Sequence, residues 1–133
     1  EVWQSGPDGL YDVQKDHDIV DLRATLQTLE DGSYFFKTVK PKYYPIPVDG
    51  PVGSLLNKLD RHPFRPAHIH FMVKAEGYAD LITHVFIDGD KYLDSDTVFA
   101  VKKSLIRKLV YKIEEGTTQK CFHLNFDIVM EKL

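Results

Sequence analysis

Residues 65–74 read RPAHIHFMVK, and the alternation in the second part of this stretch decides the fold class. Ile69, Phe71 and Val73 would share one face of a β-strand, because successive side chains of a strand point to opposite faces. His68 and His70 would then share the other face. The pattern predicts a strand over 68–74 that turns an apolar face to a core and presents two imidazoles on the opposite face.

Four other short runs are rich in β-branched and aromatic residues and are separated by Gly, Asp and Pro, which favour turns. They cover residues 34–40, 81–87, 108–114 and 120–130. In the last run, every second residue from Phe122 to Met130 is apolar, which predicts a core-facing side. Short strands with frequent turns are typical of an all-β sandwich or barrel.

One segment has helical spacing instead. Val98, Val101 and Leu105 fall on one helix face, and the polar residues at 94–96 before them are good N-caps. We therefore predict one short helix over about 96–107. The stretch 43–60 holds three prolines and two glycines, which predicts a long ordered loop with a helical turn at about 54–59.

The composition is that of an ordinary water-soluble domain. The chain has 133 residues, and 17 Lys and Arg against 20 Asp and Glu give a net charge of −3. The lack of a basic excess argues against binding to nucleic acid or to a membrane surface. No apolar run approaches the roughly 18 residues that span a bilayer. The single cysteine, Cys121, excludes an internal disulfide and a cysteine-based zinc site, and we expect a cytoplasmic protein.

The two histidines of residues 68–70 are the first candidate for chemistry. On a strand, His68 and His70 would project to the same side and could bind one metal ion, or they could simply lie on a solvated face. Further ligands are needed for a metal site, and two sets are open. Glu76 would complete a cupin-like iron(II) site of two histidines and one carboxylate. Tyrosine phenolates, which favour a trivalent metal, are the other set: Tyr11, Tyr34, Tyr43 and Tyr44.

Several longer motifs resemble one family, the intradiol ring-cleavage dioxygenases of the catechol and hydroxyquinol 1,2-dioxygenase type. These motifs are VWQ at 2–4, GLYDVQ at 9–14, YPIPVDGP at 44–51, RHPFRPAHIHF at 61–71, THVFIDGD at 83–90 and YLDSD at 92–96. The resemblance runs from residue 2 to about residue 130.

The resemblance implies a fold, a cofactor and a reaction. The fold would be mainly β, a β-sandwich of two mixed sheets with one short helix and long ordered loops. Two tyrosinates and two histidines would hold a non-haem iron(III), and the matching positions are Tyr11, Tyr44, His68 and His70. Counting back from residues 49–51 assigns Tyr44 rather than Tyr43. The enzyme would use O₂ to cleave a 1,2-dihydroxybenzene between its two hydroxyl-bearing carbons, giving a muconate-type diacid.

The resemblance also implies roles for single residues. Tyr44 matches the tyrosine that substrate displaces from the metal, and Arg65 matches an arginine that stabilises the developing carbanion. His84 is either catalytic or a buried hydrogen-bonded support. Thr97 and Val98 match pocket-wall positions, although a helix cap and core packing would explain them equally well. The sequence of residues 83–96 resembles that of hydroxyquinol-type members, which favours hydroxyquinol as substrate over catechol or a chlorocatechol.

The chain departs from the family at its start. Residue 1 is Glu rather than Met, we expect no signal peptide, and the family's N-terminal helical region and first strands have no counterpart in this chain. We therefore expect residues 1–133 to form the catalytic β-sandwich domain alone, and a homodimer would form through the missing region. The alternatives are the cupin-like site of His68, His70 and Glu76, and a non-catalytic β-sandwich binding module.

Overall fold

The computed structural model describes residues 1–15, 20–113, 116, 118 and 120–133. Its main sheet has five strands in the order β2-β1-β5-β6-β7. All neighbours are antiparallel except β6 and β7, which are parallel, so this sheet is mixed. The strands are β1 (Val2–Gln4), β2 (Arg23–Ala24), β5 (His68–Val73), β6 (Leu81–Ile87) and β7 (Ile106–Arg107).

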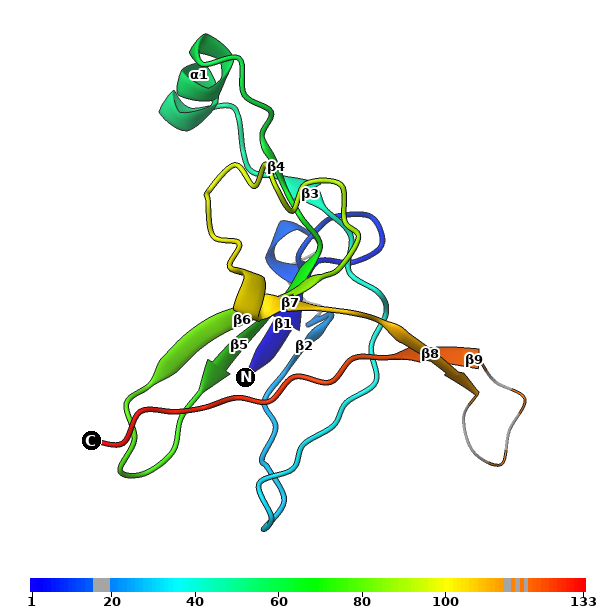
Figure 1. Cartoon of the computed structure of the whole chain (residues 1–133). Helices are drawn as coiled ribbons and strands as arrows, with labels where there is room; N and C mark the ends of the chain where they lie inside the picture. Colours follow the sequence, from blue (N-terminus) through cyan, green and yellow to red (C-terminus); the bar gives the residue numbers. More distant parts are fainter. Residues whose placement is uncertain (16–19, 114–115, 117, 119) are drawn as a thin grey trace.

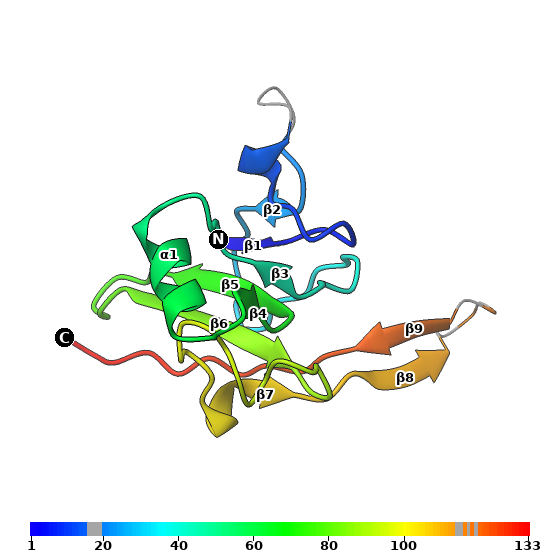
Figure 2. The same ribbon diagram turned by 90° about the horizontal axis from the view of Figure 1, so that it is seen from above.

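Two small hairpin sheets complete the strand content. The first pairs β3 (Tyr44–Pro45) with β4 (Phe64–Arg65), and the second pairs β8 (Val110–Ile113) with β9 (Lys120–His123). The chain between β3 and β4 contains the helix α1 (Pro51–Lys58), and 3₁₀ turns lie at η1 (Asp12–Gln14) and η2 (Lys103–Leu105). Figure 1 shows α1 beyond β3 and β4 at one end, and Figure 2 shows the β8–β9 hairpin projecting away from the main sheet.

The core lies on one face of the main sheet. Ile69, Phe71 and Val85 are buried there, as the alternation of residues 68–74 predicts. Extended segments cover this face with partly buried side chains: Tyr34, Phe36, Leu124, Phe126 and Ile128. The Tyr34 hydroxyl donates to the Phe126 carbonyl, which joins the two covering segments. The mainly β, two-layered architecture is confirmed, although the second layer is extended chain rather than a second mixed sheet.

The predicted strands match the structure unevenly. The run 81–87 coincides with β6, and the run 68–74 contains β5. Residues 34–40 are extended but unpaired in a ladder, and β9 ends at His123 instead of continuing to residue 130. Residue 114, at the end of the run 108–114, lies outside the described residues.

The prediction of a helix over 96–107 is wrong, because the α-helix of the described chain is α1 at Pro51–Lys58. The Asp96 carboxylate accepts the backbone N–H groups of Val98 and Ala100, and Phe99 has a φ of 56°, which a right-handed helix excludes. The chain then passes through η2 into β7, which lies beside β6. No helix in the described parts of the chain is long and apolar enough to cross a membrane.

Candidate metal centre

The face of the main sheet opposite the core carries the predicted site residues. His68 and His70 project from β5, and the register places His84 of β6 directly opposite His70. Tyr11 comes from the loop that leads into η1, and Tyr44 lies in β3, where it pairs with Arg65 of β4. The loop before η1, the β3–β4 pair and the β5–β6 pair therefore meet at one place.

Four donor atoms converge at this place. The Tyr11 hydroxyl oxygen lies 3.1 Å from the Tyr44 hydroxyl, 3.1 Å from His70 Nε2 and 3.5 Å from His68 Nε2. The two histidine Nε2 atoms lie 3.0 Å apart. Two ligands about 2.1 Å from one ion and at a right angle to each other are separated by about 3 Å. The donor set therefore has the spacing, and the mixture of oxygen and nitrogen, that suits a single hard metal ion.

The hydrogen bonding of His68 prepares its ring to act as a ligand. Its Nδ1 lies 2.7 Å from the Pro66 carbonyl oxygen, which can only accept, so the proton belongs on Nδ1. The Nε2 lone pair then faces the donor cluster. Burial lowers the pKa of His68 well below its ordinary value, and burial together with His84 lowers the pKa of His70 to about 4. Both rings are thus neutral at pH 7, which is the form that binds a metal.

Tyr11, in contrast to the two histidines, is held in the form that does not bind a metal as long as no cation is near. Burial, reinforced by the neighbouring Tyr44, raises the pKa of the Tyr11 hydroxyl above its ordinary value. The phenol is therefore protonated at pH 7 and donates to the Tyr44 oxygen. A metal ion would reverse this preference, because a bound cation is the largest local charge and stabilises the phenolate. Metal binding at this site would release protons.

Arg65 lies against the cluster and is held rigidly. Its Nε donates to Asp96 Oδ1 at 3.3 Å, and its Nη1 lies 3.3 Å from His68 Nε2. Both Arg65 and Asp96 are buried. A guanidinium that is fixed by a buried carboxylate provides a positive charge at a defined position beside the donors.

The remaining predicted residues lie around this centre to different extents. The His84 ring is 5.5 Å from His68 and 5.6 Å from His70 between centroids, and its buried Nε2 has no hydrogen-bond partner in the described chain. Thr97 is buried in the loop after Asp96, and its hydroxyl is likewise unpartnered there. Val98 is 45% exposed, so it packs in neither a helix nor the core.

The structure does not assemble the cupin-like alternative. Glu76 is exposed in the turn after β5, away from the two histidines. Among the described residues, no group of three or more His, Cys, Asp and Glu side chains could hold a metal ion. Tyr43, the neighbour of Tyr44, packs edge-to-face against Phe64 and Tyr92.

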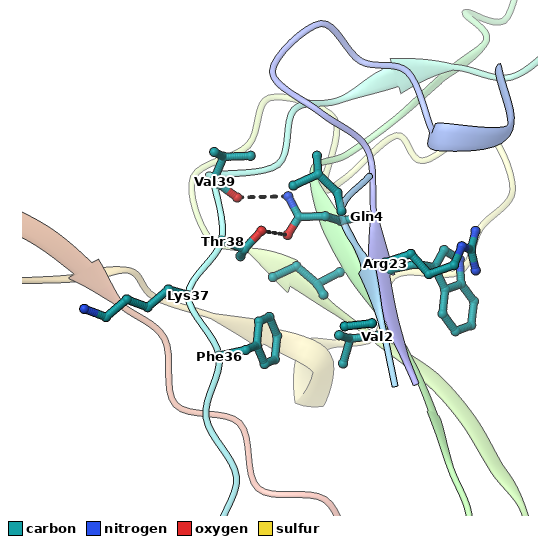
Figure 3. Close-up of a pocket in the computed structure, with 11 residues that line it drawn as sticks. Val2, Gln4, Arg23, Phe36, Lys37, Thr38 and Val39 are labelled. Atoms are coloured by element: carbon teal, nitrogen blue, oxygen red, sulfur yellow. Dashed lines mark hydrogen bonds between the residues drawn. The ribbon is translucent and has the colours of Figure 1, made fainter. Parts of the chain in front are cut away.

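Two pockets lie away from the donor cluster. The larger, of about 460 Å³, lies between β1, β2 and the extended residues 36–39. Figure 3 shows Gln4 in this pocket, where its side chain bonds to the Val39 carbonyl and to the Thr38 hydroxyl. The other, of about 350 Å³, lies beside the loops at residues 40–43 and 87–91. Neither pocket contains Tyr11, Tyr44, His68 or His70.

Comparisons with known proteins identify the family of the chain. A family model described as "Dioxygenase" matches residues 1–132. The 6-chlorohydroxyquinol 1,2-dioxygenase of Cupriavidus pinatubonensis (strain JMP 134 / LMG 1197) is 51% identical over 98% of this chain and 46% of its own length. The hydroxyquinol 1,2-dioxygenase of Rhizobium sp. (strain MTP-10005) is 54% identical over 80% of this chain and 37% of its own length.

A solved structure of a relative has the same fold. Hydroxyquinol 1,2-dioxygenase from Pseudomonas putida DLL-E4 superimposes with a TM-score of 0.90 at 40% identity, over 99% of this chain and 49% of that one. The two-layered β fold is therefore shared with a solved dioxygenase structure. The chain belongs to the intradiol ring-cleavage dioxygenase family. It spans less than half the length of these relatives.

Proposed function

We propose that this chain is the iron-binding domain of an intradiol dioxygenase, with Tyr11, Tyr44, His68 and His70 as ligands of a non-haem iron(III). The observation that carries this proposal is the convergence of two phenol oxygens and two imidazole nitrogens at 3.0–3.5 Å. Two phenolates offset most of the charge of a trivalent ion, which suits a partly buried site. The neutral histidines complete the set without adding charge.

The residues around the donors suit the cleavage of a 1,2-dihydroxybenzene. When bound, iron(III) would supply a Lewis acid for the two diol oxygens. The Tyr44 oxygen would accept one phenolic proton of the substrate. Arg65, fixed by Asp96, would stabilise the negative charge that develops on the ring. Reaction with O₂ would break the bond between the two hydroxyl-bearing carbons, and both oxygen atoms would enter the diacid product.

Hydroxyquinol is the substrate that we favour, with catechol and chlorocatechol next. Relatives at 50–54% identity are named hydroxyquinol 1,2-dioxygenases, whereas a catechol 1,2-dioxygenase from Candida albicans is 41% identical. The homodimer that the family resemblance implies stays a prediction. Because it would form through a region that this chain does not include, sedimentation of a form as long as the relatives would test it.

The visible spectrum of the iron-loaded chain tests the site. We expect a broad tyrosinate-to-iron(III) band that moves to longer wavelength when hydroxyquinol or catechol is added without oxygen. The diol that saturates this shift at the lower concentration is the preferred substrate. A colourless chain with full iron occupancy would exclude tyrosine ligands, and a chain that binds no iron would favour a non-catalytic sandwich.

Single substitutions test the ligand assignment. We expect Tyr11→Phe and Tyr44→Phe each to weaken the coloured band and to lower iron content, because each removes one phenolate. Tyr43→Phe is the matched control, since Tyr43 is adjacent to Tyr44 but packs against Phe64 and Tyr92. Glu76→Gln should also leave colour and iron unchanged. Loss of colour in either control, with retention in the Tyr44 variant, would contradict the assignment.

A further inference from the structure

A row of four side chains crosses the main sheet on the face that carries the donors. Trp3 of β1 pairs with Arg23 of β2 on one side and with His70 of β5 on the other, and His70 pairs with His84 of β6. The Trp3 indole is stacked on the His70 ring, with centroids 4.8 Å apart and the planes within 3°. The Arg23 guanidinium carbon lies 5.6 Å from the indole centroid. Trp3 therefore lies between a cation and one of the proposed ligands.

Arg23 also fixes the turn that carries Tyr11. Its Nε and Nη2 donate to the two carboxylate oxygens of Asp12 at 2.9 and 3.2 Å. Asp12 directly follows Tyr11, is buried, and accepts the backbone N–H of Val13. A planar guanidinium that binds both oxygens of a carboxylate sets its orientation as well as its distance. One arginine thus contacts the supports of two donors that come from distant parts of the chain.

We propose that Arg23 is a positioning residue of the metal centre, which sets the Tyr11 oxygen through Asp12 and the plane of the His70 ring through Trp3. This inference rests on the proposed iron site. It assigns to that site a residue that touches none of the four donor atoms. Replacing a residue that orients a metal ligand commonly lowers metal affinity by about 10- to 100-fold.

The position of Arg23 makes the idea testable without damage to the core. Arg23 lies on the edge strand β2, and its side chain is 35% exposed. Arg23→Met keeps an unbranched apolar side chain and removes both the positive charge and the paired guanidinium N–H donors. Arg23→Lys keeps the charge but cannot bind both carboxylate oxygens of Asp12 in the bidentate geometry of a guanidinium.

Arg107 offers a matched control on the same sheet. It lies on the edge strand β7, its guanidinium carbon is 5.4 Å from the Phe126 ring centroid, and it donates to two backbone carbonyls. Arg107→Met therefore removes an edge-strand arginine and its aromatic contact on the side of the sheet away from β2. Any general effect of losing such an arginine should appear equally in this variant.

Two readouts besides activity report on the centre. Trp3 is the single tryptophan of the chain and is stacked on His70, so its fluorescence should be quenched as iron(III), supplied as citrate, fills the site. The tyrosinate band of the loaded chain reports the geometry of the phenolates. We expect Arg23→Met to weaken iron binding by about 10- to 100-fold and to shift the band, and Arg23→Lys to lie between this variant and the wild type.

The outcomes separate this inference from the proposed function. A wild-type chain with the band, together with an Arg23→Met variant of unchanged affinity and band, overturns the positioning role alone. An equal loss of iron affinity in Arg107→Met also overturns the positioning role. A wild-type chain that binds no iron overturns the iron site and this inference with it. If Arg23→Met does not fold, wild-type values in Arg23→Lys overturn the inference.

Discussion

His68 shows how a single backbone atom determines what a side chain can do. The Pro66 carbonyl, two residues earlier, holds the Nδ1 proton, and the Nε2 lone pair is left to face Tyr11, His70 and Arg65. A histidine that was free to exchange tautomers would present a lone pair there only part of the time. The order Pro66-Ala67-His68 thus determines the chemistry of the ring as well as its location.

Asp12 gives a prediction at the same scale, because the Arg23 guanidinium lowers the pKa of its carboxyl below the ordinary value of 3.8. A carboxyl with a lowered folded pKa stabilises the fold above its unfolded pKa, and this stabilisation is lost as the pH falls through the folded value. We expect the melting temperature of the wild type to exceed that of Asp12→Asn at pH 6, and the gap to narrow below about pH 4. Melting curves at pH 6, 4 and 3 measure this. A gap that is constant with pH would show that the ion pair contributes nothing.

The loop from Asp96 to Val101 shows the limits of periodicity at the scale of an element. Its apolar residues have helical spacing, yet Asp96 uses its carboxylate for Arg65 and for two nearby N–H groups, and Phe99 takes a left-handed conformation. These bonds compete with a helix in the same way as other short side chain to backbone bonds. The partner that decides the outcome, Arg65, is 31 residues away in the chain. No local pattern could reveal it.

Asp96 should therefore matter more than its place in a loop suggests. Replacing it by Ala leaves the buried Arg65 cation without its carboxylate, and we expect the free energy of unfolding to fall by about 3 kcal/mol. Asp96→Asn, which keeps an acceptor for the backbone N–H groups, should cost less. Asp94→Ala, at an exposed neighbour, is the control and should cost under about 0.5 kcal/mol. Urea denaturation of the metal-free chain gives all three values, and equal costs at residues 94 and 96 would contradict this explanation.

The difference between local spacing and distant pairing explains which parts of the site could be predicted. His68, His70 and Tyr44 lie in motifs whose spacing is local, and the structure brings them together with Tyr11. The stacking of Trp3 on His70 and the role that we propose for Arg23 were not predicted. Both depend on β1 lying between β2 and β5, an arrangement of strands far apart in the sequence. Pairing across such distances leaves no periodic signal within any one strand.

For the whole molecule, Phe71 joins the two layers of the fold. Its ring lies 6.2, 6.3 and 5.4 Å from the rings of Tyr34, Phe36 and Phe126, which belong to the covering segments. Phe122 was predicted to continue this core face, but it is 59% exposed because β9 belongs to the projecting hairpin. The alternation of residues 122–130 therefore describes the core only from Leu124 to Ile128.

This difference gives a paired prediction. Phe71→Ala should lower the free energy of unfolding by about 3–5 kcal/mol, because it leaves a cavity between the layers. Phe122→Ala removes the same group from an exposed position and should cost under about 1 kcal/mol, mainly its contact with Tyr111. Chemical denaturation measures both. Similar values for the two variants would mean that the covering segments do not form a packed second layer.

The spacing of the four donors along the chain has a consequence for folding and iron retention. Tyr11 and Tyr44 are 33 residues apart, and a further 24 residues separate Tyr44 from His68. A bound ion would act as a cross-link that closes both loops, and loops of this length lose considerable entropy when their ends are joined. In the unfolded chain the donors are scattered, so metal affinity becomes folding free energy. We therefore expect iron to leave at the rate at which the chain opens, so that a single slow event sets the lifetime of both the metal and the native state.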